Sequence, residues 1–85
     1  MIAAQKEDVT FKLLDTVVLN KDLPRHSLKR GDIGTVVELP DPAALEVEFV
    51  AVSGKTEALL TLDLTDVRSV GDTDLVSVRP YSRTK

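Results

Sequence analysis

An imidazole beside a hydroxyl is the basis of nucleophilic catalysis, so histidine and serine are the first side chains to consider in this chain. Its 85 residues include one histidine, His26, which stands in a basic segment between Arg25 and Ser27. A triad needs a histidine held by an acid and facing a nucleophile, and a metal site needs several converging ligands. Since the sequence has no second imidazole and no cysteine, we expect His26 to be a surface residue and expect no catalytic residue, metal or cofactor.

Carboxylates are the second group with chemical potential. Glu46 and Glu48 stand two residues apart in a strand-like run, which places them on one face about 7 Å apart, within the reach of glycosidase carboxylates. We expect both to be solvated on the outer face, where neither is tuned to act as an acid. Four aspartates further along lack the glycine and closing glutamate of a calcium loop and are interpreted as turn and cap residues: Asp63, Asp66, Asp72 and Asp74. The sequence therefore indicates a protein that is not an enzyme.

Binding is the remaining class of function, and a basic loop is its first candidate. Residues 20–30 carry four cationic side chains against a single acid, Asp22, whereas residues 31–78 are strongly acidic. We predict contact with a partner through this loop and the C-terminal tail, at Arg25, His26, Lys29, Arg30, Tyr81 and Arg83. The alternative is structural: a solvated loop that pairs with the acidic strands, and a frayed terminus.

Nucleic acid is the less favoured partner. The net charge of −3 opposes broad attraction to phosphate. Bases stack on exposed rings, and we assign Phe11 and Phe49 to the core, which leaves Tyr81 alone. The N-terminal residues lack an apolar run of signal-peptide or membrane-spanning length, so we expect no contact with a membrane and a cytoplasmic protein.

Alternating apolar and polar residues predict an all-β domain, most clearly where Leu45, Val47 and Phe49 face the core. We predict five to six short antiparallel strands, over residues 10–19, 33–39, 44–50, 56–62, 67–70 and 74–79. The first should bend near Leu13–Leu14, the second should end before Pro40, and a 3₁₀ turn should lie near Asp63–Asp66. This pattern favours a small barrel over residues 10–79, between a flexible segment, 1–9, and a tail, 80–85.

Glycine marks the points where the chain should turn or bend. Gly31 and Gly34 open an apolar strand, and Gly54 lies between Ser53 and Lys55 in a predicted hairpin. Because glycine adopts positive φ without a steric penalty, we assign all three to structural turns or bulges.

Several ordered blocks of sequence resemble a family of small, mostly uncharacterised bacterial proteins of the domain-of-unknown-function type. The similarity spans Phe11 to Val70 and rests on Phe11-Lys12-Leu13-Leu14-Asp15-x-Val17, Asp22-Leu23-Pro24, Leu28-x-Arg30-Gly31-Asp32-Ile33-Gly34-Thr35-Val36-Val37-Glu38, Glu46-Val47-Glu48-Phe49 and Gly54-x-Thr56. The resemblance implies an SH3-like barrel and brings no established active site. The Arg-Gly-Asp-Ile-Gly-Thr-Val-Val segment is similar to the KOW turn and strand of ribosomal and transcription factors.

These observations together predict a non-catalytic interaction module that binds another protein. The gene context that the resemblance implies, beside small toxin-like reading frames, points to the product of a neighbouring gene and to an antitoxin-like or accessory role. Two alternatives remain open: a KOW-like module that contacts nucleic acid, and a barrel-like accessory subunit of a larger enzyme.

Overall fold

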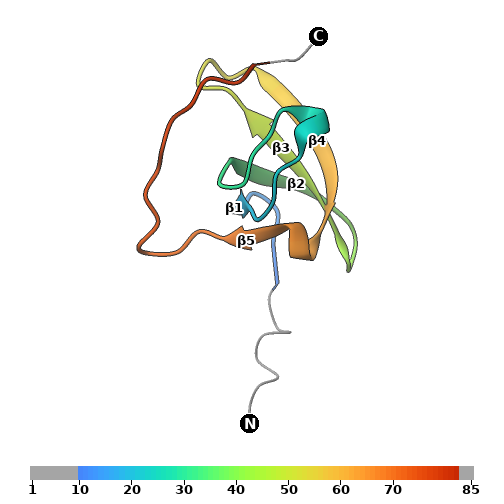
Figure 1. Cartoon of the computed structure of the whole chain (residues 1–85). Coiled ribbons are helices and arrows are strands. Elements are labelled where there is room, and N and C mark those ends of the chain that lie inside the picture. Colours follow the sequence, from blue (N-terminus) through green and yellow to red (C-terminus); the bar gives the residue numbers. More distant parts are fainter. Residues whose placement is uncertain (1–9, 83–85) are drawn as a thin grey trace.

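The computed structural model describes residues 10–82, which fold into one antiparallel sheet of five strands (Figure 1). The strands are Thr16–Leu19 (β1), Ile33–Asp41 (β2), Ala44–Val50 (β3), Thr56–Asp63 (β4) and Val67–Ser69 (β5). Two short 3₁₀ helices, Pro24–His26 (η2) and Leu64–Asp66 (η3), lie in the connections. The strand order is β4-β3-β2-β1-β5, so consecutive strands pair from β1 to β4 and the last strand returns to the first. The predicted all-β class is confirmed.

The core is formed by the strands in which buried and exposed side chains alternate, most regularly in β3. Leu45, Val47 and Phe49 are buried, as the alternation of β3 predicts. Glu46 and Glu48 were expected to face water fully; both are half-buried, because the neighbouring strands β2 and β4 flank them on either side. The Thr56 hydroxyl donates a hydrogen bond to Glu48. The other buried members of the cluster come from the other four strands and from two loop positions: Phe11, Val17, Leu19, Leu28, Val36, Leu62 and Val67.

Two strand boundaries differ from the prediction by more than one residue. Residues 10–15 are not a strand, because the expected bend at Leu13–Leu14 is a full turn in which Leu14 takes a φ of +73°. The carboxylate of Asp15 closes this turn by accepting the Lys12 N–H at 2.8 Å. β2 continues past Pro40 to Asp41, because shifts in its register with β3 accommodate the proline.

The predicted sixth strand, residues 74–79, is absent, and the sheet does not close into a barrel. Residues 70–82 instead form an irregular strap that leaves β5 and arcs past the sheet to the hairpin between β3 and β4 (Figure 1). Alternation at Leu75, Val76 and Val78 resembles a strand, but no neighbouring strand supplies a ladder for it. Within residues 10–82, β4 and β5 remain the unpaired edges.

The three predicted structural glycines serve two different purposes. Gly31 and Gly54 have φ values of +98° and +94°, which confirms their assignment to turns. Gly34 lies inside β2 opposite Val17, without a positive φ. A Cβ there would lie 2.5 Å from Val47 Cγ1, 2.9 Å from Phe49 Cε1 and 3.1 Å from the Glu48 carbonyl oxygen. Glycine is favoured at this position because the side chains of Val47 and Phe49 occupy the space that a Cβ would fill.

Replacing Gly34 with alanine should therefore destabilise the domain by overpacking, by about 1–3 kcal/mol. The matched control is G71A, since a Cβ at Gly71 meets only Asp74 Oδ2, at an ordinary 3.5 Å. We expect G71A to stay within about 0.5 kcal/mol of the wild type. Urea unfolding followed by circular dichroism measures both variants, and equal stabilities would contradict the close approach at Gly34.

Candidate functional site

The basic loop between β1 and β2 is ordered by short-range hydrogen bonds. Leu23 and Leu28 form an isolated bridge, in which the Leu23 N–H donates to the Leu28 carbonyl at 2.8 Å. Leu28 is buried in the core. The Asp22 carboxylate accepts the Arg30 N–H at 2.9 Å. The loop is thus held at its middle by an apolar anchor and at its end by a carboxylate.

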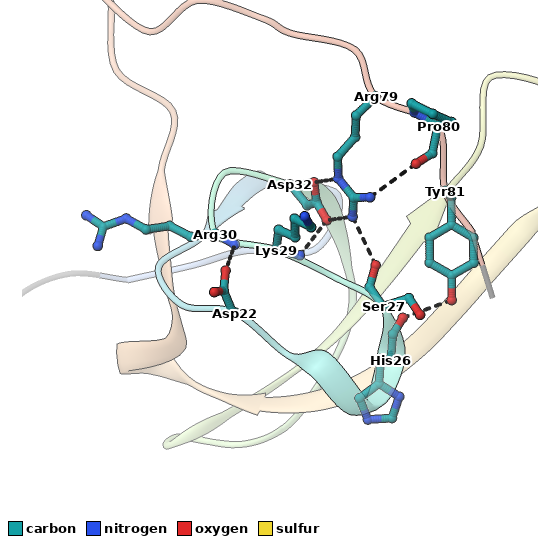
Figure 2. A network of polar contacts seen from close by, with 9 residues as sticks. All are labelled: Asp22, His26, Ser27, Lys29, Arg30, Asp32, Arg79, Pro80 and Tyr81. Carbon is teal, nitrogen blue, oxygen red and sulfur yellow. Dashed lines mark hydrogen bonds and ion pairs between the residues drawn. The ribbon is translucent and has the colours of Figure 1, made fainter. Parts of the chain in front are cut away.

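The end of the strap is attached to this loop through Asp32 (Figure 2). The Arg79 guanidinium forms a two-pronged ion pair with the Asp32 carboxylate, with Nε 3.0 Å from Oδ1 and Nη2 2.5 Å from Oδ2. Nη2 also donates to the Ser27 carbonyl at 3.0 Å. The same Asp32 carboxylate accepts the Lys29 N–H at 2.8 Å. One side chain therefore closes the turn that begins β2 and fixes residue 79.

Tyr81 makes the next contact along the strap. Its hydroxyl donates to the His26 carbonyl at 2.9 Å, and its half-buried ring packs against the core cluster (Figure 2). The strap end therefore contacts the loop through one cationic and one aromatic side chain, two residues apart.

The electrostatics agree with this geometry. Burial alone would raise the pKa of Asp32, but the hydrogen bonds from Arg79 and from the Lys29 N–H outweigh it, so the pKa lies below the ordinary value. The same hydrogen bond raises the pKa of Arg79. Both shifts favour the charged pair.

The start of the strap is held in a similar way. The Asp74 carboxylate accepts the Gly71 N–H at 2.6 Å and pairs with both terminal nitrogens of Arg68, at 2.7 and 3.0 Å. The hydrogen bond from Arg68, with that from Gly71, lowers the pKa of Asp74 to about 2. The strap is thus anchored at Asp74 and again at Arg79, and between them Leu75, Val76 and Val78 are almost fully exposed.

A groove of about 690 Å³ lies between the strap and the sheet. Its walls come from the loop 28–33, the end of β3 with its hairpin, and strap residues 76–81. Apolar side chains with exposed surface line it on both sides, namely Ile33, Val50, Val52, Val76 and Val78. An open groove with apolar walls is the feature of this molecule most suited to receive another chain.

The predicted site residues do not form one patch. Arg25, His26, Lys29 and Arg30 are all exposed, but the Arg30 side chain points away from Arg79 and Tyr81, and the His26 ring points to a different side of the loop (Figure 2). Lys29 and Arg30 line the groove. Tyr81 is not a free ring, and Arg83 lies outside the described residues.

The sequence did not indicate Asp32 as a site residue, and it placed Arg79 at the end of the predicted strand 74–79 and not in the site. A signal was present: an aspartate that accepts the N–H three residues earlier recurs at Lys12–Asp15, Lys29–Asp32, Asp63–Asp66 and Gly71–Asp74. The predicted 3₁₀ turn at Asp63–Asp66 is confirmed and is closed by a reciprocal pair of these bonds. The spacing identifies the turns, but it does not reveal which carboxylate also binds a distant arginine.

A family model described as Domain of unknown function (DUF4926) matches residues 13–69. The chain belongs to this family. No curated protein and no solved structure matches the chain. The DUF4926 match ends at Ser69, the last residue of β5, so the strap lies beyond the matched region and is attached to it through Asp32, Ser27 and His26.

Within residues 10–82, no three His, Asp or Glu side chains are grouped so that they could hold a metal ion. The same part of the chain has no helix with the length and hydropathy needed to cross a bilayer.

Acid should release the end of the strap before it unfolds the sheet. The folded-state pKa of Asp32 lies below that of an unfolded aspartate, about 3.9, so its carboxylate stabilises fully above that pH. That stabilisation is lost as the pH falls through the folded value. Tyr81 is the single tyrosine and the chain has no tryptophan, so intrinsic fluorescence reports on this contact. We expect the emission to change below about pH 4 while far-ultraviolet circular dichroism is retained.

The control variants separate Asp32 from general acid effects. D32N should show the acid-form emission at neutral pH, because asparagine still accepts the Lys29 N–H but no longer pairs as a charge with Arg79. D22N alters the other loop aspartate, whose described bond is to the Arg30 N–H, and should titrate as the wild type does. Identical neutral emission from D32N and the wild type would refute the assignment.

Proposed function

We propose that this chain is a non-catalytic interaction module that binds another protein in the groove between the strap and the sheet. The observation that carries the proposal is the pair of apolar walls, Ile33, Val50 and Val52 on the sheet side and Val76 and Val78 on the strap. Val52, Val76 and Val78 are 101%, 79% and 87% exposed. Apolar side chains left in water on facing walls gain free energy when a partner covers them.

The composition of the groove supports a protein ligand over nucleic acid. Its apolar centre is flanked by two cations, Lys29 and Arg30, and by the carboxylate of Glu57. A ring of mixed charge around an apolar centre is typical of protein interfaces. Phosphate binding requires cations that converge, whereas His26 and Arg30 point to different sides of the loop (Figure 2). Arg79 is already paired with Asp32, and the ring of Tyr81 is packed against the core.

The partner and setting are proposed on the same basis. We propose a protein encoded beside this one, in an antitoxin-like or accessory role, and a cytoplasmic location. The fold is proposed to be an open form of the SH3-like architecture, supported by the strand order in which β5 returns to β1. An accessory subunit of a larger enzyme would present the same groove, and nucleic-acid contact through Arg25, Lys29 and Arg30 is the alternative that the test must address.

The test uses a matched pair of strap substitutions and the product of the adjacent gene as ligand. Val78 lines the groove, whereas Leu75 is equally exposed but does not. We expect V78D to weaken the complex by about tenfold or more and L75D to change it by less than about threefold, measured by isothermal titration calorimetry. Equal losses from the two variants would contradict binding in the groove.

The nucleic-acid alternative gives a different result. Here R25E/K29E/R30E would abolish binding to random single-stranded RNA, and the affinity of the wild type would fall with salt by about 0.7 log unit per log unit for each phosphate contacted. We expect no measurable affinity of the wild type for RNA at near-physiological salt. Micromolar affinity for RNA at this salt concentration would contradict the proposed function and support the nucleic-acid alternative.

A further inference from the structure

The strap end is held by the contacts that a receptor makes to a peptide. Two nitrogens of Arg79 donate three hydrogen bonds: Nε and Nη2 donate to the two oxygens of Asp32, and Nη2 also donates to the Ser27 carbonyl. The Tyr81 hydroxyl donates to the His26 carbonyl. A planar guanidinium matched to a carboxylate gives geometric selectivity that an ammonium group does not. Proline between the two side chains limits the backbone to an extended form. The groups that hold the strap end, namely the Asp32 carboxylate and the carbonyls of Ser27 and His26, are the receptor groups. Their arrangement fits an extended Arg-x-Tyr segment.

The segment that leads to these contacts lies outside the sheet. Leu75, Val76 and Val78 are 92%, 79% and 87% exposed, and residues 70–82 form no ladder with the sheet. The DUF4926 match covers Ser27 and Asp32 but ends at Ser69. The receptor groups thus belong to the family domain, whereas Arg79 and Tyr81 come from a segment outside it.

We propose that the surface formed by His26, Ser27 and Asp32 is a binding site for an extended Arg-x-Tyr segment of a partner protein. In the free chain its own strap end, residues 79–81, occupies this site as an intramolecular competitor. The inference deepens the proposed function and rests on it, since it names the feature of the partner that is recognised beside the groove. A partner segment would displace residues 79–81 and would lay its neighbouring residues along the apolar wall on the sheet side, formed by Ile33, Val50 and Val52.

Competition between the strap end and an external segment sets the size of the expected change in affinity. A tail on a short tether is present at the site at an effective concentration in the millimolar range. If the tail fills the site nine-tenths of the time, an external segment binds about tenfold more weakly than it would to an empty site. Removing the tail side chains should therefore strengthen binding, the opposite of the usual effect of deleting a contact.

The experiment compares the full wild-type chain with the full-length variant R79A/Y81F, which keeps every receptor group. The probe is a capped synthetic peptide with the sequence of residues 77–82, Ser-Val-Arg-Pro-Tyr-Ser. Nuclear magnetic resonance titration follows the backbone amides of Lys29 and Asp32, and thermal unfolding confirms that each variant is folded. We expect the peptide to bind R79A/Y81F about tenfold more tightly than the wild type.

Two further variants show whether the expected groups recognise the peptide. Adding D32N to R79A/Y81F should abolish binding, whereas adding D22N should leave it unchanged, because the described contact of Asp22 is with the Arg30 N–H. A peptide with lysine in place of arginine should bind at least about tenfold more weakly, since it cannot pair with both carboxylate oxygens.

Four results would overturn the inference. The first is equal affinity of the peptide for the wild type and for R79A/Y81F, and the second is peptide binding that survives D32N. The third is dimerisation of the wild type that R79A/Y81F abolishes, because the occupant would then be the tail of a second copy. If the peptide fails to bind while V78D still weakens the partner complex, the inference fails and the proposed function stands.

Discussion

The carboxylate of Asp32 is the interaction on which the arrangement around the groove depends. It closes the turn that begins β2 through the Lys29 N–H and holds the strap through Arg79. The pair with Arg79 requires the ionised form, and the pKa of Asp32 lies below its ordinary value because the bonds from Arg79 and Lys29 outweigh the cost of partial burial. The start of the sheet's longest strand and the position of the strap are consequently set by one side chain.

The turn-closing hydrogen bond of Asp32 recurs at three other aspartates. Asp15, Asp66 and Asp74 each accept the N–H of the residue three positions earlier, and the last two also pair with a basic side chain, Lys21 and Arg68. Asp66 and Asp74, two of the four aspartates that the sequence indicated as turn and cap residues, are therefore accounted for by turn closure. A small sheet with few regular elements needs such local bonds because its loops contribute little apolar burial.

Local pattern was sufficient to predict most of the fold. Alternation located β3 to the residue, and the positive φ of Gly31 and Gly54 followed from their positions in turns. Prediction failed where the secondary structure or the role of a residue depends on its neighbours in the fold and not on its neighbours in the sequence. Residues 74–79 alternate like a strand but have no neighbour to pair with, and Gly34 looks like a turn residue yet is favoured because side chains of β3 occupy the space that a Cβ would fill. The link between Asp32 and Arg79 spans 47 positions, and spacing along the chain carries no record of it.

The separation of the strap's anchors from its exposed middle has an evolutionary consequence. Gly71 and Asp74 at one end and Arg79 and Tyr81 at the other fix its course, whereas the side chains between them contact water and not the core. Mutations at positions 75–78 can accumulate without a loss of stability that selection would remove. Lineages that share this sheet are then able to diverge in what they recognise while their hydrophobic interiors stay constant.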